Sequence, residues 1–403
     1  MRAPKSADPP RPIQSRSANE SKPCCWGEPA LVIDGIPVGK TIRPESIAQL
    51  TAAVADEKGS IVPMGSGTQM EYGNPLRTAD CLVDLSGLSR ITTYNPAELT
   101  IHVEAGATLG QIQSALAPNK QALPLDPWNG PAATIGGIAA TNAQGPMRAI
   151  GSIRDWIIGM TVIHVDGRVS KTGGRVVKNV TGYDLAKLYT GSLGTLILIT
   201  EISFKLKAQF PKTSTAVAEF GSLAEALAVL AVIRRSPLQP IACELVGRSN
   251  PAAHSVWMRF GEHPAAVAWQ IKQLPPAAWK VVEGEDESAV WENLRVEHSR
   301  LGPVVIRAVG LPSEIDTMLN QFRPTSWIAH AASGVALLAF DSADGIERLR
   351  DRFPAVMEKA PLEVRRKVAT FGVRGTEKRL MNEMKQKFDP GGRLNPGRHV
   401  DGE

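Results

Sequence analysis

The chain has 403 residues, of which 43% are hydrophobic and 21% charged. This composition is ordinary for a soluble globular protein, and at roughly 100–200 residues per domain we expect two domains with sizeable cores. The net charge of +5 comes without a lysine- and arginine-rich run interleaved with aromatic residues, which argues against nucleic acid as a partner.

The N-terminal region and the cysteines give further limits. Residues 1–28 are rich in proline, serine and arginine and lack an apolar segment, so we expect a disordered tail rather than a signal peptide. No apolar run along the chain is long enough for a transmembrane segment. Cys24, Cys25, Cys81 and Cys243 form no C-x-x-C pair, which argues against a zinc site or an iron–sulphur cluster. Few, scattered cysteines are typical of a cytoplasmic protein.

The first half of the chain predicts short strands alternating with helices. A helix is expected over residues 46–58, with its apolar face at Leu50 and Val54, and a strand follows at 61–63. Residues 98–104 alternate between apolar and polar, as a half-buried strand does, and Thr108 is suited to cap the next helix. The first half is therefore predicted to have an α+β fold.

The middle of the chain predicts a hairpin, and the second half predicts a separate α+β domain. Asp166 and Gly167 lie between two strand-like segments and favour a tight turn. From Pro211 the composition changes, and a capping box at 222–225 opens a helix that is followed by alternating strands and helices. A last helix is expected over residues 376–388.

Two glycine-rich stretches carry the first functional hypothesis. In residues 63–69, Gly65 and Gly67 allow the backbone amides to approach an anion such as a pyrophosphate, although a plain tight turn would use the same residues. Met70 stands where a Rossmann fingerprint needs its third glycine, so this is not a Rossmann site. Residues 133–142 are expected to form a second loop, in which small residues around Gly136 and Gly137 indicate that a flat ligand or a second chain segment lies against the backbone.

Together, five motifs resemble the p-cresol methylhydroxylase/vanillyl-alcohol oxidase superfamily of flavoproteins, and within it the FAD-binding E subunits of bacterial glycolate oxidases. The resemblance covers residues 29–400. The motifs are Pro63-x-Gly65-x-Gly67-Thr68, Thr134-Ile135-Gly136-Gly137, the block at 174–185, Gly191-Ser192-Leu193-Gly194-Thr195 and Asn395-Pro396-Gly397-Arg398.

The resemblance implies an α+β fold with a two-lobed FAD-binding domain of the p-cresol methylhydroxylase type, followed by an α+β cap domain. The implied bounds are 29–209 for the FAD-binding domain, 210–375 for the cap domain and 376–403 for a segment that returns to the FAD-binding domain. Because neither main glycine stretch holds the histidine that tethers flavin in several relatives, the resemblance points to non-covalent FAD.

The resemblance also implies which residues contact FAD. Segment 65–69 would hold the pyrophosphate, segment 134–142 would run beside the ribityl chain and the ring, and 199–201 would lie near the adenine. The implied contact residues are Pro63, Gly65, Ser66, Gly67, Thr68, Gln69, Thr134, Ile135, Gly136, Gly137, Ala140, Asn142, Arg148, Lys178, Ile199, Thr200 and Asn395. Arg148, Arg175 and Lys178 have two interpretations, as contacts to a phosphate or substrate carboxylate or as structural cations.

One block departs from the catalytic relatives. In glycolate oxidase D subunits, a His-Ala-Gly-Asp-Gly-Asn-x-His block supplies catalytic or metal-ligand histidines. Here His330 remains, while Ser333, Val335 and Leu337 replace the aspartate, the asparagine and the second histidine. Because a base needs an oriented partner and a metal needs several ligands, we interpret His330 as structural, predict no metal site and leave the catalytic residues unassigned.

The function that the resemblance implies is that of an FAD-carrying subunit in a complex that oxidises glycolate or another small 2-hydroxy acid and passes electrons to an external acceptor. The implied partners are a catalytic flavin subunit and an iron–sulphur subunit, with the complex in the cytoplasm or held at the inner membrane by its partners. Two alternatives stay open, namely a self-sufficient FAD-dependent 2-hydroxy acid dehydrogenase and a non-enzymatic FAD-binding scaffold.

Overall fold

The computed structural model describes residues 31–174, 183–400 and 402, and the structural statements below concern these residues. The predicted tail at 1–28, with Cys24 and Cys25, lies outside the described residues, as do Arg175 and Lys178. From Val32 onward the chain forms one unit by its internal contacts.

The first sheet of this unit is parallel, and its strands lie in the order β3, β5, β4. The elements here are β1 (Val32–Ile33), β2 (Ile36–Pro37), β3 (Lys40–Ile42), α1 (Ile47–Asp56), β4 (Ile61–Met64) and β5 (Cys81–Asp84). Helix α1 begins where the Ser46 side chain accepts a backbone N–H, and its buried Leu50 and Val54 face the core. Because parallel strands end at one edge of a sheet, the first glycine stretch leaves β4 at the edge where β5 also ends.

The second sheet is antiparallel, with strand order β10-β9-β11-β7-β6. The elements around it are β6 (Ile91–Asn95), β7 (Thr100–Glu104), α2 (Leu109–Leu116), β8 (Gln121–Ala122), α3 (Ile135–Thr141), α4 (Ile153–Trp156), β9 (Ile157–Ile163), β10 (Val169–Gly173), α5 (Leu185–Tyr189), β11 (Leu198–Lys205) and β12 (Lys207–Ala208). The predicted hairpin is confirmed, since Val169 pairs with Ile163 on either side of the turn. Thr108 caps α2 in a capping box with Gln111.

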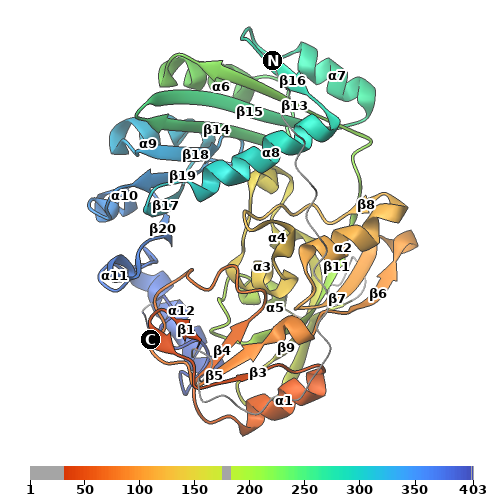
Figure 1. Cartoon of the computed structure of the whole chain (residues 1–403), viewed down its shortest axis with the longest axis vertical. Helices are drawn as coiled ribbons and strands as arrows, with labels where there is room; N and C mark the ends of the chain where they lie inside the picture. The colour runs from red at the N-terminus through yellow and green to blue at the C-terminus, as the bar shows by residue number, and fades with distance from the viewer. Residues whose placement is uncertain (1–30, 175–182, 401, 403) are drawn as a thin grey trace, which may run out of the picture. The chain divides into compact units, whose positions relative to one another are not determined.

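The third sheet has eight strands in the order β16-β13-β15-β14-β18-β19-β17-β20. Its elements are β13 (Lys212–Phe220), α6 (Leu223–Arg235), β14 (Ala242–Ser249), β15 (Ala252–Glu262), α7 (Pro264–Lys272), β16 (Lys280–Val282), α8 (Gly284–Ser299), β17 (Val304–Val309), α9 (Ile315–Phe322), β18 (Ser326–His330), β19 (Val335–Phe340), α10 (Ile346–Arg350) and β20 (Ala355–Lys359). Helices α6, α7, α9 and α10 share one core with the sheet, whereas α8 crosses its other face, as Figure 1 shows.

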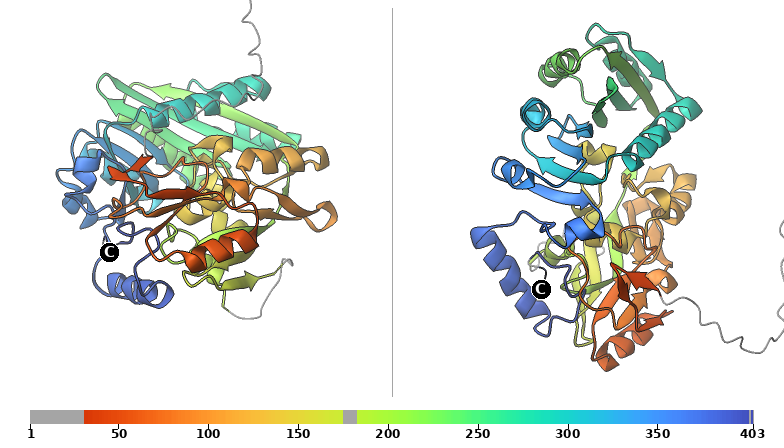
Figure 2. Two further views of the ribbon diagram at one scale, coloured as in Figure 1. Left: turned by 60° about the horizontal axis from the view of Figure 1, so that its bottom comes forward. Right: turned by 60° about the vertical axis from the view of Figure 1, so that its left-hand side comes forward.

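The C-terminal segment comes back to the first sheet after α11 (Leu362–Arg365) and α12 (Gly375–Phe388). The backbone N–H of Ile61 donates to the Arg393 carbonyl at 2.8 Å, and the N–H of Asn395 donates to the Ile61 carbonyl at 2.9 Å. Figure 2 shows the C-terminal end close to these first strands in both views. A segment more than 330 residues further along the chain therefore extends β4 at its edge.

The predicted α+β class is confirmed, with two local differences. The stretch around Gly136, expected as a loop, forms the short helix α3, because buried Ile135 and Ile138 anchor it in the core. The strand expected from residue 98 begins at Thr100, because Leu99 has a left-handed φ of 52°. No helix within the described ranges combines the length and the apolar character that crossing a bilayer requires.

Candidate functional site

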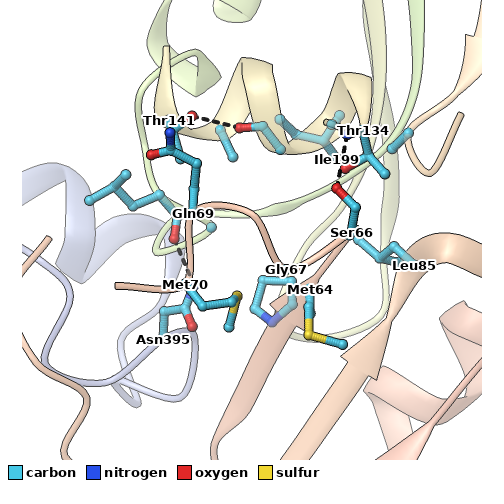
Figure 3. Close-up of a pocket in the computed structure, with 18 of the residues that line it drawn as sticks. Met64, Ser66, Gly67, Gln69, Met70, Leu85, Thr134, Thr141, Ile199 and Asn395 are labelled. Atoms are coloured by element: carbon cyan, nitrogen blue, oxygen red, sulfur yellow. Dashed lines mark hydrogen bonds between the residues drawn. The ribbon is translucent and has the colours of Figure 1, made fainter. Parts of the chain in front are cut away.

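A cavity of about 100 Å³ lies where β4, α3, the start of β11 and the C-terminal turn come together. Figure 3 shows part of its lining. The lining residues are Pro63, Met64, Gly65, Ser66, Gly67, Thr68, Gln69, Met70, Tyr72, Leu85, Ala105, Thr134, Gly136, Gly137, Ala140, Thr141, Leu193, Gly194, Ile197, Leu198, Ile199, Asn395 and Arg398.

The loop after β4 forms one wall of this pocket with its backbone. Gly67 has a left-handed φ of 75°, and a Cβ built there would meet only the Met64 sulfur, at 3.7 Å. Gly65 sits so close to Thr134 that a Cβ would collide with its hydroxyl. The Ser66 hydroxyl accepts the backbone N–H of Thr134 at 3.3 Å, a bond drawn in Figure 3. The loop is therefore held against the start of α3 with its glycine turn open to the pocket.

A neighbouring segment braces the same loop. The Gln69 side chain donates to the Asn129 amide oxygen at 2.7 Å, and the Asn129 amide nitrogen donates back to the Thr68 carbonyl. These two bonds fix the end of the loop without using the backbone amides of Gly65 to Gly67.

Helix α3 forms the opposite wall, and its two glycines have different roles. A Cβ on Gly136 would lie 2.7 Å from the Cβ of Ala105, because the N–H of Gly136 donates to the Ala105 carbonyl at 2.7 Å. A Cβ on Gly137 would meet only the Thr134 hydroxyl, at 3.1 Å. Gly136 thus lets the helix sit on the end of β7, while Gly137 keeps the wall flat.

The C-terminal turn closes the pocket with one buried cation and one buried amide. Arg398 donates to the carbonyls of Tyr72 at 3.1 Å and of Met70, and burial lowers its pKa to about 10 although the nearby Asp34 carboxylate opposes this. The Asn395 amide nitrogen donates to the Leu193 carbonyl at 2.6 Å. The Asn395 amide oxygen is buried and has no hydrogen-bond partner within the described chain, which fits a ligand that donates to it.

Most residues that the resemblance implied as FAD contacts lie around this one cavity. Those that line it are Pro63, Gly65, Ser66, Gly67, Thr68, Gln69, Thr134, Gly136, Gly137, Ala140, Ile199 and Asn395. Lys178 is outside the described residues.

Four implied contact residues do not line the cavity. Ile135 is buried in the core beneath α3, and Asn142 ends that helix with a left-handed φ of 51°. Thr200 lies at an irregularity in the pairing of β11 with β9, and its hydroxyl donates to the Thr161 carbonyl. Arg148 lies on the short 3-10 helix Pro146–Ile150, which contacts β14 instead.

Several residues that line the pocket were not expected from the sequence. Tyr72, Leu85, Ala105 and Ile197 reach the cavity through tertiary packing, and no local pattern marks them. Leu193 and Arg398 lie inside motifs that carried the resemblance, and this membership is the signal that could have identified them.

One interpretation of the sequence needs correction. His330 was taken to lack an oriented partner, but its Nδ1 lies 2.7 Å from one carboxylate oxygen of Glu244 and 2.9 Å from the other. Both side chains are buried, and they face each other because Glu244 on β14 pairs in register with His330 on β18. Burial lowers the pKa of His330 well below its usual value and raises that of Glu244 well above its own. Among the described residues no cluster with three or more metal-ligand side chains occurs.

Comparison with known proteins identifies a family and several relatives that this chain resembles. Residues 40–173 match the family model of an FAD binding domain. The glycolate oxidase subunit GlcE of Escherichia coli strain K12 is 33% identical over 277 residues, which cover 68% of this chain and 74% of that protein. The mitochondrial D-lactate dehydrogenase [cytochrome] of Arabidopsis thaliana is 31% identical over 203 residues, which cover 50% of this chain and 35% of that protein.

A solved structure supports the fold. An alkyldihydroxyacetonephosphate synthase structure superposes with a TM-score of 0.65 over 88% of this chain and 76% of that one, at 14% identity. The matched FAD binding model gives FAD as the cofactor, and the pocket with its glycine backbone wall and unpartnered Asn395 oxygen is the candidate site for it.

The two glycines at 67 and 136 should respond differently to the same substitution. Gly67→Val places a side chain at the open turn, so we expect folded protein that binds little FAD. In Gly136→Val the side chain meets Ala105, so we expect a loss of stability of roughly 1–3 kcal/mol or more rather than a folded, colourless protein. Thermal unfolding and FAD content of the purified variants measure the two effects.

Gly345→Val is the matched control for Gly67→Val. Gly345 also has a left-handed backbone, with φ of 83°, and open space around its missing Cβ, but it caps α10 away from the pocket. It carries the same backbone strain and should keep its FAD. Equal FAD content in Gly67→Val and the control would show that the loop at 65–69 is not the FAD wall.

Proposed function

We propose, since this chain belongs to the glycolate oxidase subunit GlcE family of FAD-binding oxidoreductases, that it carries FAD in a complex that oxidises a small 2-hydroxy acid. The observation that carries the proposal is the pocket between the loop after β4 and helix α3. The relatives' names supply the substrate class, because glycolate and D-lactate are both 2-hydroxy acids.

The pocket residues divide the work of holding FAD. The backbone of residues 65–69 would hold the pyrophosphate, and the flat wall of α3 at Gly137 and Ala140 would lie beside the ribityl chain and ring. The Asn395 amide oxygen would accept one hydrogen bond from the cofactor. Bound FAD supplies the two-electron acceptor that oxidation of an alcohol carbon requires.

A complex with partner subunits is supported by two features of the chain. The Escherichia coli relative GlcE is itself named as a subunit of glycolate oxidase. The four cysteines of this sequence have no spacing that would ligate an iron–sulphur cluster. We therefore propose a catalytic flavin subunit and an iron–sulphur subunit as partners, in a complex that acts in the cytoplasm or at the inner membrane.

A second candidate function is favoured by one observation. The buried contact between His330 and Glu244 gives the histidine the oriented partner that a general base needs, which supports a self-sufficient FAD-dependent 2-hydroxy acid dehydrogenase. The replacement of the second histidine of the block by Leu337 favours the first candidate, because no second imidazole stands at that position.

The attachment of the cofactor is the first test. No histidine or cysteine is among the described residues that line the pocket, so we expect FAD to be bound without a covalent link. Acid precipitation of the purified full chain should release all of its flavin into the supernatant, measured by absorbance. Flavin that stays in the washed, denatured pellet would contradict this prediction.

The need for partners is the second test. We expect the FAD-loaded chain alone to reduce an artificial dye with glycolate or D-lactate about 10²–10⁴ times more slowly than the complex, which is the usual contribution of a positioned acid–base group. The measurement compares the chain alone with the chain co-expressed with the two proposed partners. A lone chain as fast as the complex, and inactivated by His330→Ala, would favour the self-sufficient enzyme instead.

A further inference from the structure

Arg148 stands out as a cation without a partner. Its guanidinium makes no hydrogen bond within the described part of the chain, and its Nε is buried. Burial lowers the pKa of Arg148, and the nearby Arg307 adds to the effect. Because an unpaired buried charge is costly, a native protein usually keeps one only where a ligand or a partner pairs with it.

The carboxyl groups near Arg148 do not hydrogen-bond to it. Glu244 contacts the imidazole of His330, one of its carboxyl oxygens has no hydrogen-bond partner within the described chain, and burial raises its pKa well above the usual value. Asp126 accepts the backbone N–H of Met147 at 2.9 Å, and burial raises its pKa to about 7. Neither carboxyl hydrogen-bonds to Arg148, so its guanidinium keeps its donors available.

The neighbouring Arg307, unlike Arg148, has hydrogen-bond partners. Arg307 on β17 donates to the Glu358 carboxylate and, at 3.2 Å, to the hydroxyl of Tyr72. Two cations thus lie within electrostatic range of each other, and only one of them is neutralised by an ion pair.

The group around Arg148 adjoins the FAD pocket on two sides. Tyr72 lines that pocket and binds Arg307. Trp128 stacks on His298, with ring centres 4.3 Å apart, and lies 5.9 Å from the ring of His330. Its neighbour Asn129 is bonded to the loop at 68–69. A ligand held by Arg148 would therefore lie between the eight-stranded sheet and the pocket.

The chemistry of these groups selects one class of ligand. A guanidinium with free donors pairs with a carboxylate through two parallel hydrogen bonds. The His330 Nε2 is buried and without a hydrogen-bond partner in the described chain, and the lowered pKa keeps the imidazole neutral. One cation beside a neutral donor or acceptor suits a monoanion with a hydroxyl group better than a doubly charged phosphate.

We propose that Arg148 is the residue that binds the substrate carboxylate, at a subsite where His330 offers a neutral polar atom to the adjacent hydroxyl. This inference rests on the proposed function, and it assigns Arg148 to substrate rather than to FAD. The sequence left Arg148 either as a contact to a phosphate or substrate carboxylate or as a structural cation, and we choose the substrate carboxylate. The subsite accounts for binding and orientation alone, so it is compatible with a chain that needs partners for turnover.

The test is a calorimetric titration of the FAD-loaded full chain with 2-hydroxyisobutyrate, a monoanionic 2-hydroxy acid that has no hydrogen on its α-carbon and therefore cannot be oxidised in the proposed reaction. Arg148→Met should weaken 2-hydroxyisobutyrate binding about 100-fold, as loss of one buried charged partner does. Arg148→Lys should retain part of the affinity. Arg300→Met is the matched control, since Arg300 pairs with Glu297 on the surface of the cap, and it should leave the affinity unchanged.

Two further readouts separate a ligand role from a structural one. If the partner of Arg148 is a ligand, Arg148→Met should keep its FAD content and show an unchanged or higher unfolding temperature without 2-hydroxyisobutyrate. A lower unfolding temperature, or 2-hydroxyisobutyrate affinity equal to that of the wild type, would overturn the proposal. A wild-type chain that binds no FAD would refute the proposed function, and the same titration of that FAD-free chain would then test the subsite separately, with loss of binding in Arg148→Met supporting it.

Discussion

The buried guanidinium of Arg398 is the contact on which the pocket depends. It binds the carbonyls of Met70, Tyr72 and Asn74, which follow the glycine turn, and it pairs with the Asp34 carboxylate at 3.0 Å. The other oxygen of Asp34 pairs with Arg365 at 2.8 Å. Removing one member of such a group leaves an uncompensated buried charge, at a cost of roughly 3–5 kcal/mol. Asp34 and Arg398, near the two ends of the described chain, therefore hold the loop that lines the pocket.

The other buried cations around the site are also paired, because an unpaired buried charge is costly. Lys385 is buried, and it donates to Asp389 at 2.6 Å and to the Thr195 carbonyl at 2.9 Å, so α12 is fixed beside the turn at 191–195. Arg307 is paired with Glu358 on the next strand. These cations are paired, whereas Arg148 has no hydrogen-bond partner within the described chain, and we assign that role to the substrate carboxylate.

Local signals explain what the sequence predicted well. The capping box at Thr108, the turn at Asp166 and the apolar face with Leu50 each depend on residues a few positions apart, and the structure has these elements where they were expected. The predicted α+β class and FAD as cofactor are confirmed. Features that depend on distant pairing were not predictable. Glu244 faces His330 only because of the register between β14 and β18, and Gly136 meets Ala105 only because α3 sits on the end of β7.

The central claim is that this chain, by itself, forms an FAD pocket from the loop after β4, helix α3 and the C-terminal turn. The most direct measurement is the visible absorbance spectrum of the purified full chain, together with the FAD extracted from it after saturation with FAD and gel filtration. The account predicts a flavin spectrum and FAD in equimolar amount to the chain. A chain that is folded by circular dichroism yet emerges colourless would contradict it.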